Sequence, residues 1–153
     1  MTNRKTYKGK FVPKNSKKYK GDPTNIIFRS LWERRVMVWL DENENILEWS
    51  SEEIAIPYRS PLDGRIHRYF PDFLVKAKIS DGSTKTMILE VKPNNQTKEP
   101  KKQTRKTKKY ITEVTTWLVN KQKWLMAEEY CADRQWEFKI ITEDHIFGKK
   151  NNK

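Results

Sequence analysis

Two apolar, strand-like runs between Tyr69 and Pro93 are each interrupted by a carboxylate, and a lysine follows the second carboxylate. Asp72 stands near the beginning of this stretch, and Glu90 and Lys92 stand near its end. Side chains two residues apart on a β-strand point to the same face, so Glu90 and Lys92 project together. We therefore expect an acid and a base to share one face of a strand whose other face is apolar.

This combination of side chains suits hydrolysis of a phosphodiester bond. Two converging carboxylates repel each other, and a hard divalent cation relieves the repulsion. Mg²⁺ takes one or two protein carboxylates and completes its octahedron with water and phosphate oxygens. A neighbouring lysine can orient or help deprotonate an attacking water and stabilise the charge that develops on the phosphate. Asp72 could face Glu90 across a hairpin, but the sequence leaves the register open.

Each of these residues also has an ordinary structural explanation. Asp72 follows Pro71 and could be a turn or strand-start aspartate. Glu90 and Lys92 could form a solvent-facing ion pair of little energetic value. Taken together, Pro-Asp, seventeen residues and then Glu-x-Lys on an apolar strand form a more specific pattern, although such short patterns recur by chance.

A third acid, Glu33, lies in a predicted helix over residues 29–43. With successive residues about 100° apart, Glu33 falls inside the apolar arc of that helix, which consists of Trp32, Val36, Met37, Trp39 and Leu40. Ser30 stands three residues earlier, so the two could form a capping box in which Glu33 closes the start of the helix. A cap does not require a position on the apolar arc, and the residues leave both roles open.

Hydrophobic periodicity and turn signals predict the elements that would position these side chains. The helix is followed by strands at 52–58, 65–79 and 84–93, with an Asp-Gly turn before the last of them. A loop then leads to a helix at 116–134 and a strand at 136–142. The order αβββαβ predicts an α/β fold with a mixed sheet flanked by helices.

The formal net charge of +12 is unevenly distributed along the chain. Eight lysines and arginines lie between Arg4 and Lys20 without an acid, and seven lie between Lys98 and Lys109 with Glu99 alone. We expect a basic arm over 1–25, a folded domain that carries the motif over 26–147 with a basic loop at 94–110, and a basic tail at 148–153. Solvated tails are the plain alternative, but three positive segments favour a polyanionic partner such as nucleic acid.

Cysteine and histidine usage excludes several kinds of site. The single Cys131 rules out an internal disulfide and a multi-cysteine zinc site, and we expect it to be a small buried group. The two histidines, His67 and His145, are far apart, which disfavours a histidine-rich metal site. No stretch has the length and apolarity of a membrane span, and the N-terminus lacks an apolar signal core. We expect a soluble, intracellular protein without a membrane partner.

The motifs resemble those of the PD-(D/E)xK nuclease superfamily. "FPD" and "EVK" match its active-site pattern, the predicted element order matches its restriction-endonuclease-like core, and "FRSLWER" resembles its first-helix motif. Longer phrases across residues 21 to 143 resemble the TnsA-type endonuclease group and, within it, the head completion nucleases of T-even-like bacteriophages. They include "GDPTNIIFRSLWERRVMVWLD" and "NKQKWLMAEEYCADRQWEFKIITE".

The resemblance implies an Mg²⁺-dependent DNA endonuclease, with Mn²⁺ as a substitute ion and exonuclease trimming as a further activity. It implies Asp72, Glu90 and the Val91 carbonyl as metal ligands, Glu33 as a further ligand or water-positioning group, and Lys92 beside the attacking water. The expected role is head completion after DNA packaging and before tail joining, in the host cytoplasm or associated with the virion. Portal or neck proteins of the head are candidate partners.

One glutamine and seven basic residues after the motif are candidates for sequence-independent contacts with the DNA backbone. They are Gln96, Lys98, Lys101, Lys102, Arg105, Lys106, Lys108 and Lys109. Two other functions remain open: a non-catalytic DNA- or portal-binding assembly protein, and a resolvase of branched DNA. Such resolvases act as dimers, so a monomer in solution would count against the second; the sequence leaves the oligomeric state open.

Overall fold

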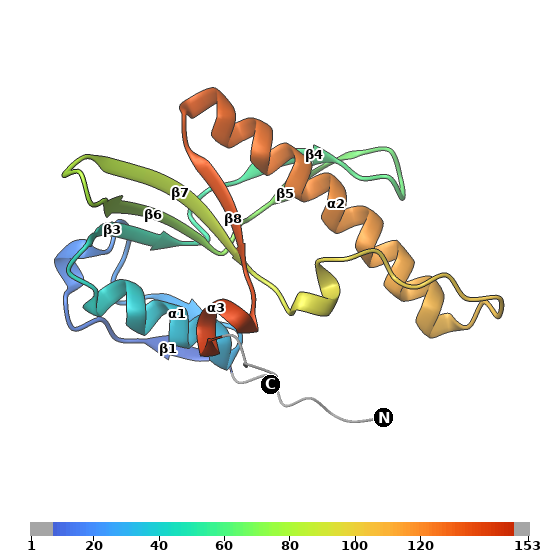
Figure 1. Ribbon diagram of the computed structural model, residues 1–153, viewed down its shortest axis with the longest axis horizontal. Coiled ribbons are helices and arrows are strands. Elements are labelled where there is room, and N and C mark those ends of the chain that lie inside the picture. The colour runs from blue at the N-terminus through green and yellow to red at the C-terminus, as the bar shows by residue number, and fades with distance from the viewer. Residues whose placement is uncertain (1–7, 149–153) are drawn as a thin grey trace.

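A four-stranded mixed sheet forms the centre of the computed structural model, which describes residues 8–148 (Figure 1). Antiparallel pairing joins the first three strands in space, and the fourth runs parallel to the third. In spatial order the strands are β3 (Ile46–Ser51), β6 (Phe73–Lys78), β7 (Thr84–Val91) and β8 (Glu137–Ile141). The predicted α/β class, with a mixed sheet flanked by helices, is confirmed.

One face of the sheet is covered by α1 (Leu31–Glu42) and the short α3 (Glu143–Phe147) (Figure 1). Alternate residues of β6 point to this face and are buried, as the two-residue period of a strand requires. They pack with Trp49 of β3 and with Met37 and Leu40 of α1 in one apolar core. Trp39, which the helical arc placed among the core residues, is 54% exposed.

The long α2 (Lys108–Arg134) covers the opposite face together with a two-stranded hairpin, β4 (Ile56–Arg59) and β5 (Ile66–Tyr69). Ile88 of β7 packs there against α2 in a second apolar core. Cys131 is buried in it, as predicted. No helix within residues 8–148 is both long and apolar enough to cross a membrane.

Much of the predicted basic arm packs onto the folded body. The segment contains β1 (Gly9–Phe11) and the 3-10 turn η1 (Ser16–Lys18), and β1 pairs with β2 (Ile26–Phe28). The Phe11 and Tyr19 side chains are buried against Trp49, with ring centroids 5.9 and 4.8 Å from that indole. Residues 8–25 of the predicted basic arm are therefore packed against the domain in the structure. The remainder of the arm, residues 1–7, and the tail residues 149–153 lie outside the described residues.

A buried carboxylate explains why this lysine-rich segment docks. Asp41 of α1 is 2% exposed, and its side chain accepts hydrogen bonds from the N–H groups of Lys14 and Asn15 at 2.8 and 3.0 Å. The Lys18 ammonium donates to the Asp41 main-chain carbonyl at 2.8 Å. Farther along, the Lys20 N–H donates to the Trp49 carbonyl on the edge of β3, so the segment also covers that edge.

The first strand of the central sheet is β3, which the sequence patterns missed. The predicted strand at 52–58 forms β4 in the side hairpin, and the predicted strand at 65–79 is divided into β5 and β6 around Pro71. Proline has no N–H to donate and a fixed φ, so it interrupts a strand there.

The second predicted helix starts earlier than expected. Thr107 caps α2 by accepting a hydrogen bond from the Tyr110 N–H at 3.1 Å. The basic loop therefore ends at residue 107, and Lys108 and Lys109 belong to the helix. Near its other end the loop contains the 3-10 turn η2 (Asn94–Gln96).

Candidate active site

Asp72 and Glu90 meet where β6 begins and β7 ends. Phe73 pairs with Leu89, so the same register places Asp72 opposite Glu90. The Asp72 N–H donates to Glu90 Oε1 at 3.3 Å, and the Val91 N–H donates to Asp72 Oδ2 at 2.7 Å. The two acids that interrupt the apolar stretch are therefore brought together by strand pairing.

The Val91 carbonyl projects from the same edge of β7 as the Val91 N–H, because both groups of one residue point to one neighbour in an antiparallel pair. That N–H points to Asp72. Continued by one more residue, the register places Pro71 opposite Val91, and proline has no N–H to donate to this carbonyl. The Val91 carbonyl is thus directed toward the Asp72 side without a strand donor from Pro71.

Glu90 is 7% exposed and is held by a tyrosine. The Tyr69 hydroxyl donates to Glu90 Oε1 at 2.8 Å. The other oxygen, Oε2, lies 4.0 Å from the Lys92 ammonium, a long ion pair. Lys92 and Glu90 share the face of β7 predicted from the two-residue spacing, while Leu89 is buried on the other face with Met87 and Val91 packed beside it.

Burial makes the ionised form of this carboxylate pair unfavourable. Desolvation raises the pKa of Asp72 well above its ordinary value, and the negative charges of Glu90 and Glu33 raise it further. Desolvation also raises the pKa of Glu90, against the opposing effects of Lys92 and the Tyr69 hydrogen bond. The pKa of Tyr69 is raised by burial and by Glu90, so its hydroxyl stays protonated and donates.

The donor set fits a hard divalent cation. Asp72 Oδ1 and Glu90 Oε2 accept no hydrogen bond from residues 8–148. Neither oxygen is fully buried, so each retains contact with the surface. With the Val91 carbonyl they offer three oxygens. No three His, Cys, Asp or Glu side chains in the described part converge on one point. Two carboxylates completed by water and phosphate oxygens are typical of Mg²⁺ sites.

Glu33 lies beside this site with the contacts of a helix cap. Its N–H donates to Ser30 Oγ at 3.1 Å, and its Oε1 accepts from the Arg29 N–H at 3.3 Å. Burial raises the pKa of Glu33, and its charge is close enough to Asp72 to raise the pKa of that group. The Ser30 cap is thus present, whereas the Glu33 carboxylate bonds to the N–H of Arg29, one residue before the cap, and does not close a capping box. The role of Glu33 as a metal ligand stays a prediction.

Three neighbours of the site were missed by the sequence patterns. Tyr69 precedes the Pro-Asp motif by two residues. Its role could be anticipated only from the general rule that a tyrosine buried on a strand needs a hydrogen-bond partner for its hydroxyl. Arg29 and Glu52 pair at 3.2 Å. The Glu52 N–H also donates to the Asp72 carbonyl at 3.1 Å, and Glu52 has a left-handed φ of 54°. No local pattern marks that pair, because its members come from different elements.

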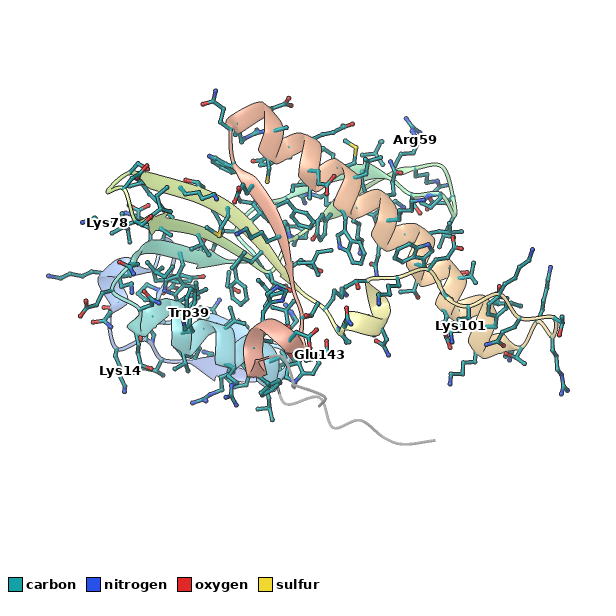
Figure 2. The ribbon with its side chains drawn as sticks, viewed as in Figure 1. Lys14, Trp39, Arg59, Lys78, Lys101 and Glu143 are labelled. Carbon is teal, nitrogen blue, oxygen red and sulfur yellow. The ribbon has the colours of Figure 1, made fainter. Side chains whose placement is uncertain are left out.

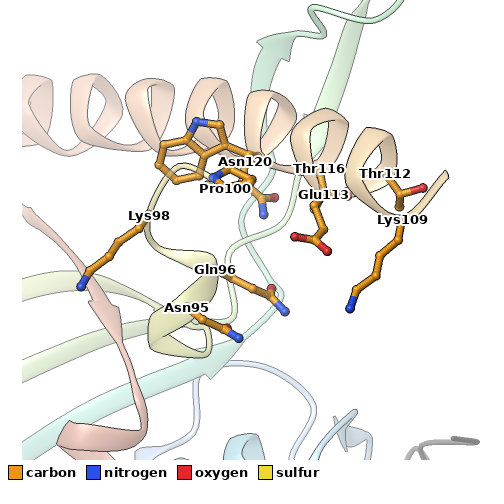
Figure 3. A pocket seen from close by; sticks show the side chains of 10 residues that line it. Asn95, Gln96, Lys98, Pro100, Lys109, Thr112, Glu113, Thr116 and Asn120 are labelled. Carbon is orange, nitrogen blue, oxygen red and sulfur yellow. The ribbon is translucent and has the colours of Figure 1, made fainter. Parts of the chain in front are cut away.

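The predicted DNA-binding residues are exposed but do not form one compact cluster. Three of them, Gln96, Lys98 and Lys109, line a pocket of about 520 Å³ between the loop and α2 (Figure 3). Lys101 lies farther out, where the loop projects beyond the sheet beside the start of α2 (Figure 2). The others are Lys102, Arg105, Lys106 and Lys108, and none of the seven basic residues forms an ion pair within residues 8–148.

Comparison with known proteins places this arrangement in a family. The chain is similar to the head completion nuclease of Enterobacteria phage T4, with 44% identity over 92 residues that cover 60% of this chain and 59% of the relative. The chain thus matches less than two thirds of that relative's length. Residues 43–143 match the model of the TnsA-like endonuclease N-terminal domain. This match includes Asp72, Glu90 and Lys92 but begins after Glu33. Because it spans more than half of the chain, the chain belongs to the TnsA-like endonuclease family.

Proposed function

We propose that the protein is a divalent-metal-dependent DNA endonuclease with its active site at Asp72, Glu90 and Lys92. The main support is the geometry where β6 begins and β7 ends. There the Asp72 carboxylate accepts a 2.7 Å hydrogen bond from the Val91 N–H and lies beside Glu90. Family membership supports the hydrolytic chemistry. Mg²⁺ is the ion we favour, because the protein offers two carboxylates and a carbonyl and leaves the other positions to water and phosphate.

Each residue of the site would have its own role in catalysis. Asp72, Glu90 and the Val91 carbonyl would hold the cation, which when bound lowers the pKa of an attacking water and neutralises charge on the scissile phosphate. Tyr69 fixes Glu90 through Oε1 and leaves Oε2 directed toward Lys92. The Lys92 ammonium, on the same face, would orient the water and stabilise the charge developing on the phosphate oxygens.

DNA is the substrate we infer from the charge distribution. The seven exposed basic residues between Lys98 and Lys109 have no acidic partners within residues 8–148, so they remain free to contact phosphates. Such contacts carry no sequence information by themselves. We expect binding with little sequence preference and a strong dependence on salt.

Head completion in a bacteriophage is the biological role that we propose. It is supported by 44% identity to a protein of that name from phage T4. On this proposal the nuclease acts on DNA at the filled head before the tail joins, and portal or neck proteins are its candidate partners.

The test is to incubate the purified protein with supercoiled, linear and branched DNA, in Mg²⁺, in Mn²⁺ or in EDTA. Asp72→Ala and Lys92→Ala are assayed beside the wild type, with folding checked by circular dichroism. Cleavage that requires the metal and is lost in both variants supports the endonuclease. A clear preference for branched DNA together with a dimer in solution would instead favour a resolvase. DNA binding by a folded protein without any cleavage would favour a non-catalytic assembly protein.

A further inference from the structure

Lys123 of α2 lies close to the tyrosine that holds Glu90. Its ammonium lies 5.7 Å from the ring centroids of both Tyr58 and Tyr69, and the Tyr69 hydroxyl donates to Glu90. The Tyr69 side chain thus contacts Lys123 through its ring and Glu90 through its hydroxyl. Lys123 therefore belongs to the same side of the sheet as the acid and base of β7.

No acidic side chain neutralises this lysine. Lys123 is half-buried and forms no ion pair within residues 8–148. Burial is the larger cause that lowers its pKa, and the positive charge of Lys92 adds to the effect. The two tyrosine rings offer cation–π attraction to the charge. Glu90 is instead occupied by Tyr69 and lies 4.0 Å from Lys92.

A pocket begins about one helical turn from Lys123 along α2. Asn120 precedes Lys123 by three residues on α2, hence on the same side of the helix, and lines the pocket of about 520 Å³. Gln96 and Lys98 contribute the facing wall, a few residues after Lys92 (Figure 3). The pocket is thus lined by residues that lie close in the chain to Lys123 on one side and to Lys92 on the other.

We propose that Lys123 is a substrate-binding residue that contacts a phosphate of the DNA strand next to the scissile phosphate, as the strand passes from the active site into this pocket. A half-buried ammonium without an acidic partner loses less hydration, and gains more attraction, than an exposed one when an anion arrives. The proposal rests on the proposed function only in taking DNA as the ligand. It does not require that the DNA be cut.

The experiment compares Lys123→Met, which keeps the aliphatic chain on the tyrosine rings, with Lys123→Arg, which keeps the charge. Lys121→Met is the matched control, because Lys121 is exposed on the same helix and its loss changes the net charge equally. Affinity for a short duplex is measured in EDTA by fluorescence anisotropy over a range of salt concentrations, and thermal unfolding verifies folding. The cleavage rate in Mg²⁺ is measured separately.

We expect Lys123→Met to weaken binding severalfold and to make the slope of log affinity against log salt shallower by about 0.9, the loss of one phosphate contact. Lys123→Arg should retain the wild-type slope, and Lys121→Met should differ little from it. Equal slopes for the two methionine variants would overturn the proposal, as would absence of DNA binding by the wild type. If the wild type binds but never cuts, and Lys123→Met still loses the contact, the proposed catalytic function fails while this inference stands.

Discussion

The Asp72 carboxylate accepts a 2.7 Å hydrogen bond from the Val91 N–H, at the point where the pairing of β6 with β7 ends. A side-chain oxygen thus takes the position of the next main-chain acceptor along the sheet. This relationship keeps Asp72 beside Glu90 and aligns it with the Val91 carbonyl. It also shows how two carboxylates can be brought together at a strand end without disturbing the core beneath them.

Asp72→Asn should separate the structural and chemical roles of that carboxylate. The amide oxygen can still accept from Val91, while the buried negative charge is removed. We expect the metal-free protein to become more stable at neutral pH, because desolvation and the charges of Glu90 and Glu33 disfavour ionised Asp72. Cleavage should fall by at least about 100-fold, the order seen when one essential electrostatic group is removed. Thermal unfolding and a plasmid-nicking assay test both outcomes.

Stabilisation by Mg²⁺ should also disappear in Asp72→Asn. A variant that Mg²⁺ stabilises as much as the wild type would show that Asp72 is not a ligand, whatever its cleavage rate.

As pH rises, the free energy of unfolding of the metal-free protein should fall, whereas the stabilisation added by Mg²⁺ should grow. The pKa values of Asp72 and Glu90 lie above their ordinary values of 3.8 and 4.5 in the folded state, so the folded state binds more protons than the unfolded chain in the range just above those values. The free energy of unfolding of the metal-free protein should then fall as pH rises through that range.

Mg²⁺ competes with these protons, so the stabilisation that it adds should grow as pH rises. Melting temperatures measured from pH 4 to 8 (about the range in which such carboxylates titrate) with Mg²⁺ and with EDTA test the two signs. The control is Asp72→Asn combined with Glu90→Gln, for which the metal-dependent difference should vanish. A pH-independent effect of Mg²⁺ on the wild type would contradict a site at these two acids.

Tyr69→Phe should weaken metal binding without disturbing the core. The ring remains, but Glu90 loses the 2.8 Å hydrogen bond that orients it. Loss of a hydrogen bond to a ligand commonly costs about 10- to 100-fold in metal affinity or activity. Tyr58→Phe is the matched control, because Tyr58 also lies under Lys123 and is buried but is not bonded to Glu90. Equal Mg²⁺ titrations of cleavage for the two variants would exclude an orienting role for Tyr69.

Glu33→Gln should keep the helix cap and lose cleavage. A glutamine oxygen can still accept from the Arg29 N–H, so stability should change by less than about 0.5 kcal/mol. The negative charge that reaches Asp72 is lost, and we expect cleavage to drop at least about tenfold, within the range for a positioned acid–base or water-orienting group. Glu33→Ala keeps the main-chain N–H that Ser30 caps but loses the hydrogen bond from the Arg29 N–H, and should in addition lose about 1 kcal/mol of stability. Full cleavage by the glutamine variant would mean that Glu33 serves the helix alone.

Tyr19→Ala should destabilise the protein strongly, although Tyr19 lies in a lysine-rich segment. Its side chain is 6% exposed, packs on Trp49, and accepts a hydrogen bond from the Ser51 N–H at 3.1 Å. Loss of a buried aromatic side chain costs about 3–5 kcal/mol. Urea unfolding measures the change, with the exposed Lys17→Ala as the control. A change below about 0.5 kcal/mol would indicate that the segment is dispensable for folding.

The sequence by itself determined the features that follow from local periodicity. The two-residue period of a strand placed Glu90 and Lys92 on one face and Leu89 on the other, and this agrees with the structure. The Ser30–Glu33 spacing indicated the capped start of α1, and the cap is present. The α/β class and the clustering of basic residues around the loop could also be derived, because each depends on neighbours a few positions apart in the chain.

Only the tertiary structure decided what depends on pairing between distant segments. The register that sets Asp72 against Glu90 arises from β6 and β7 aligning along their whole length. The choice of 46–51 as the first central strand, and the docking of Phe11 and Tyr19 on Trp49, depend on which surfaces remain to be covered once the core forms. Lys123 reaches the site only because α2 crosses that face of the sheet. Periodicity specifies the face on which a residue lies, whereas its partner is selected by packing and hydrogen bonding across the whole domain.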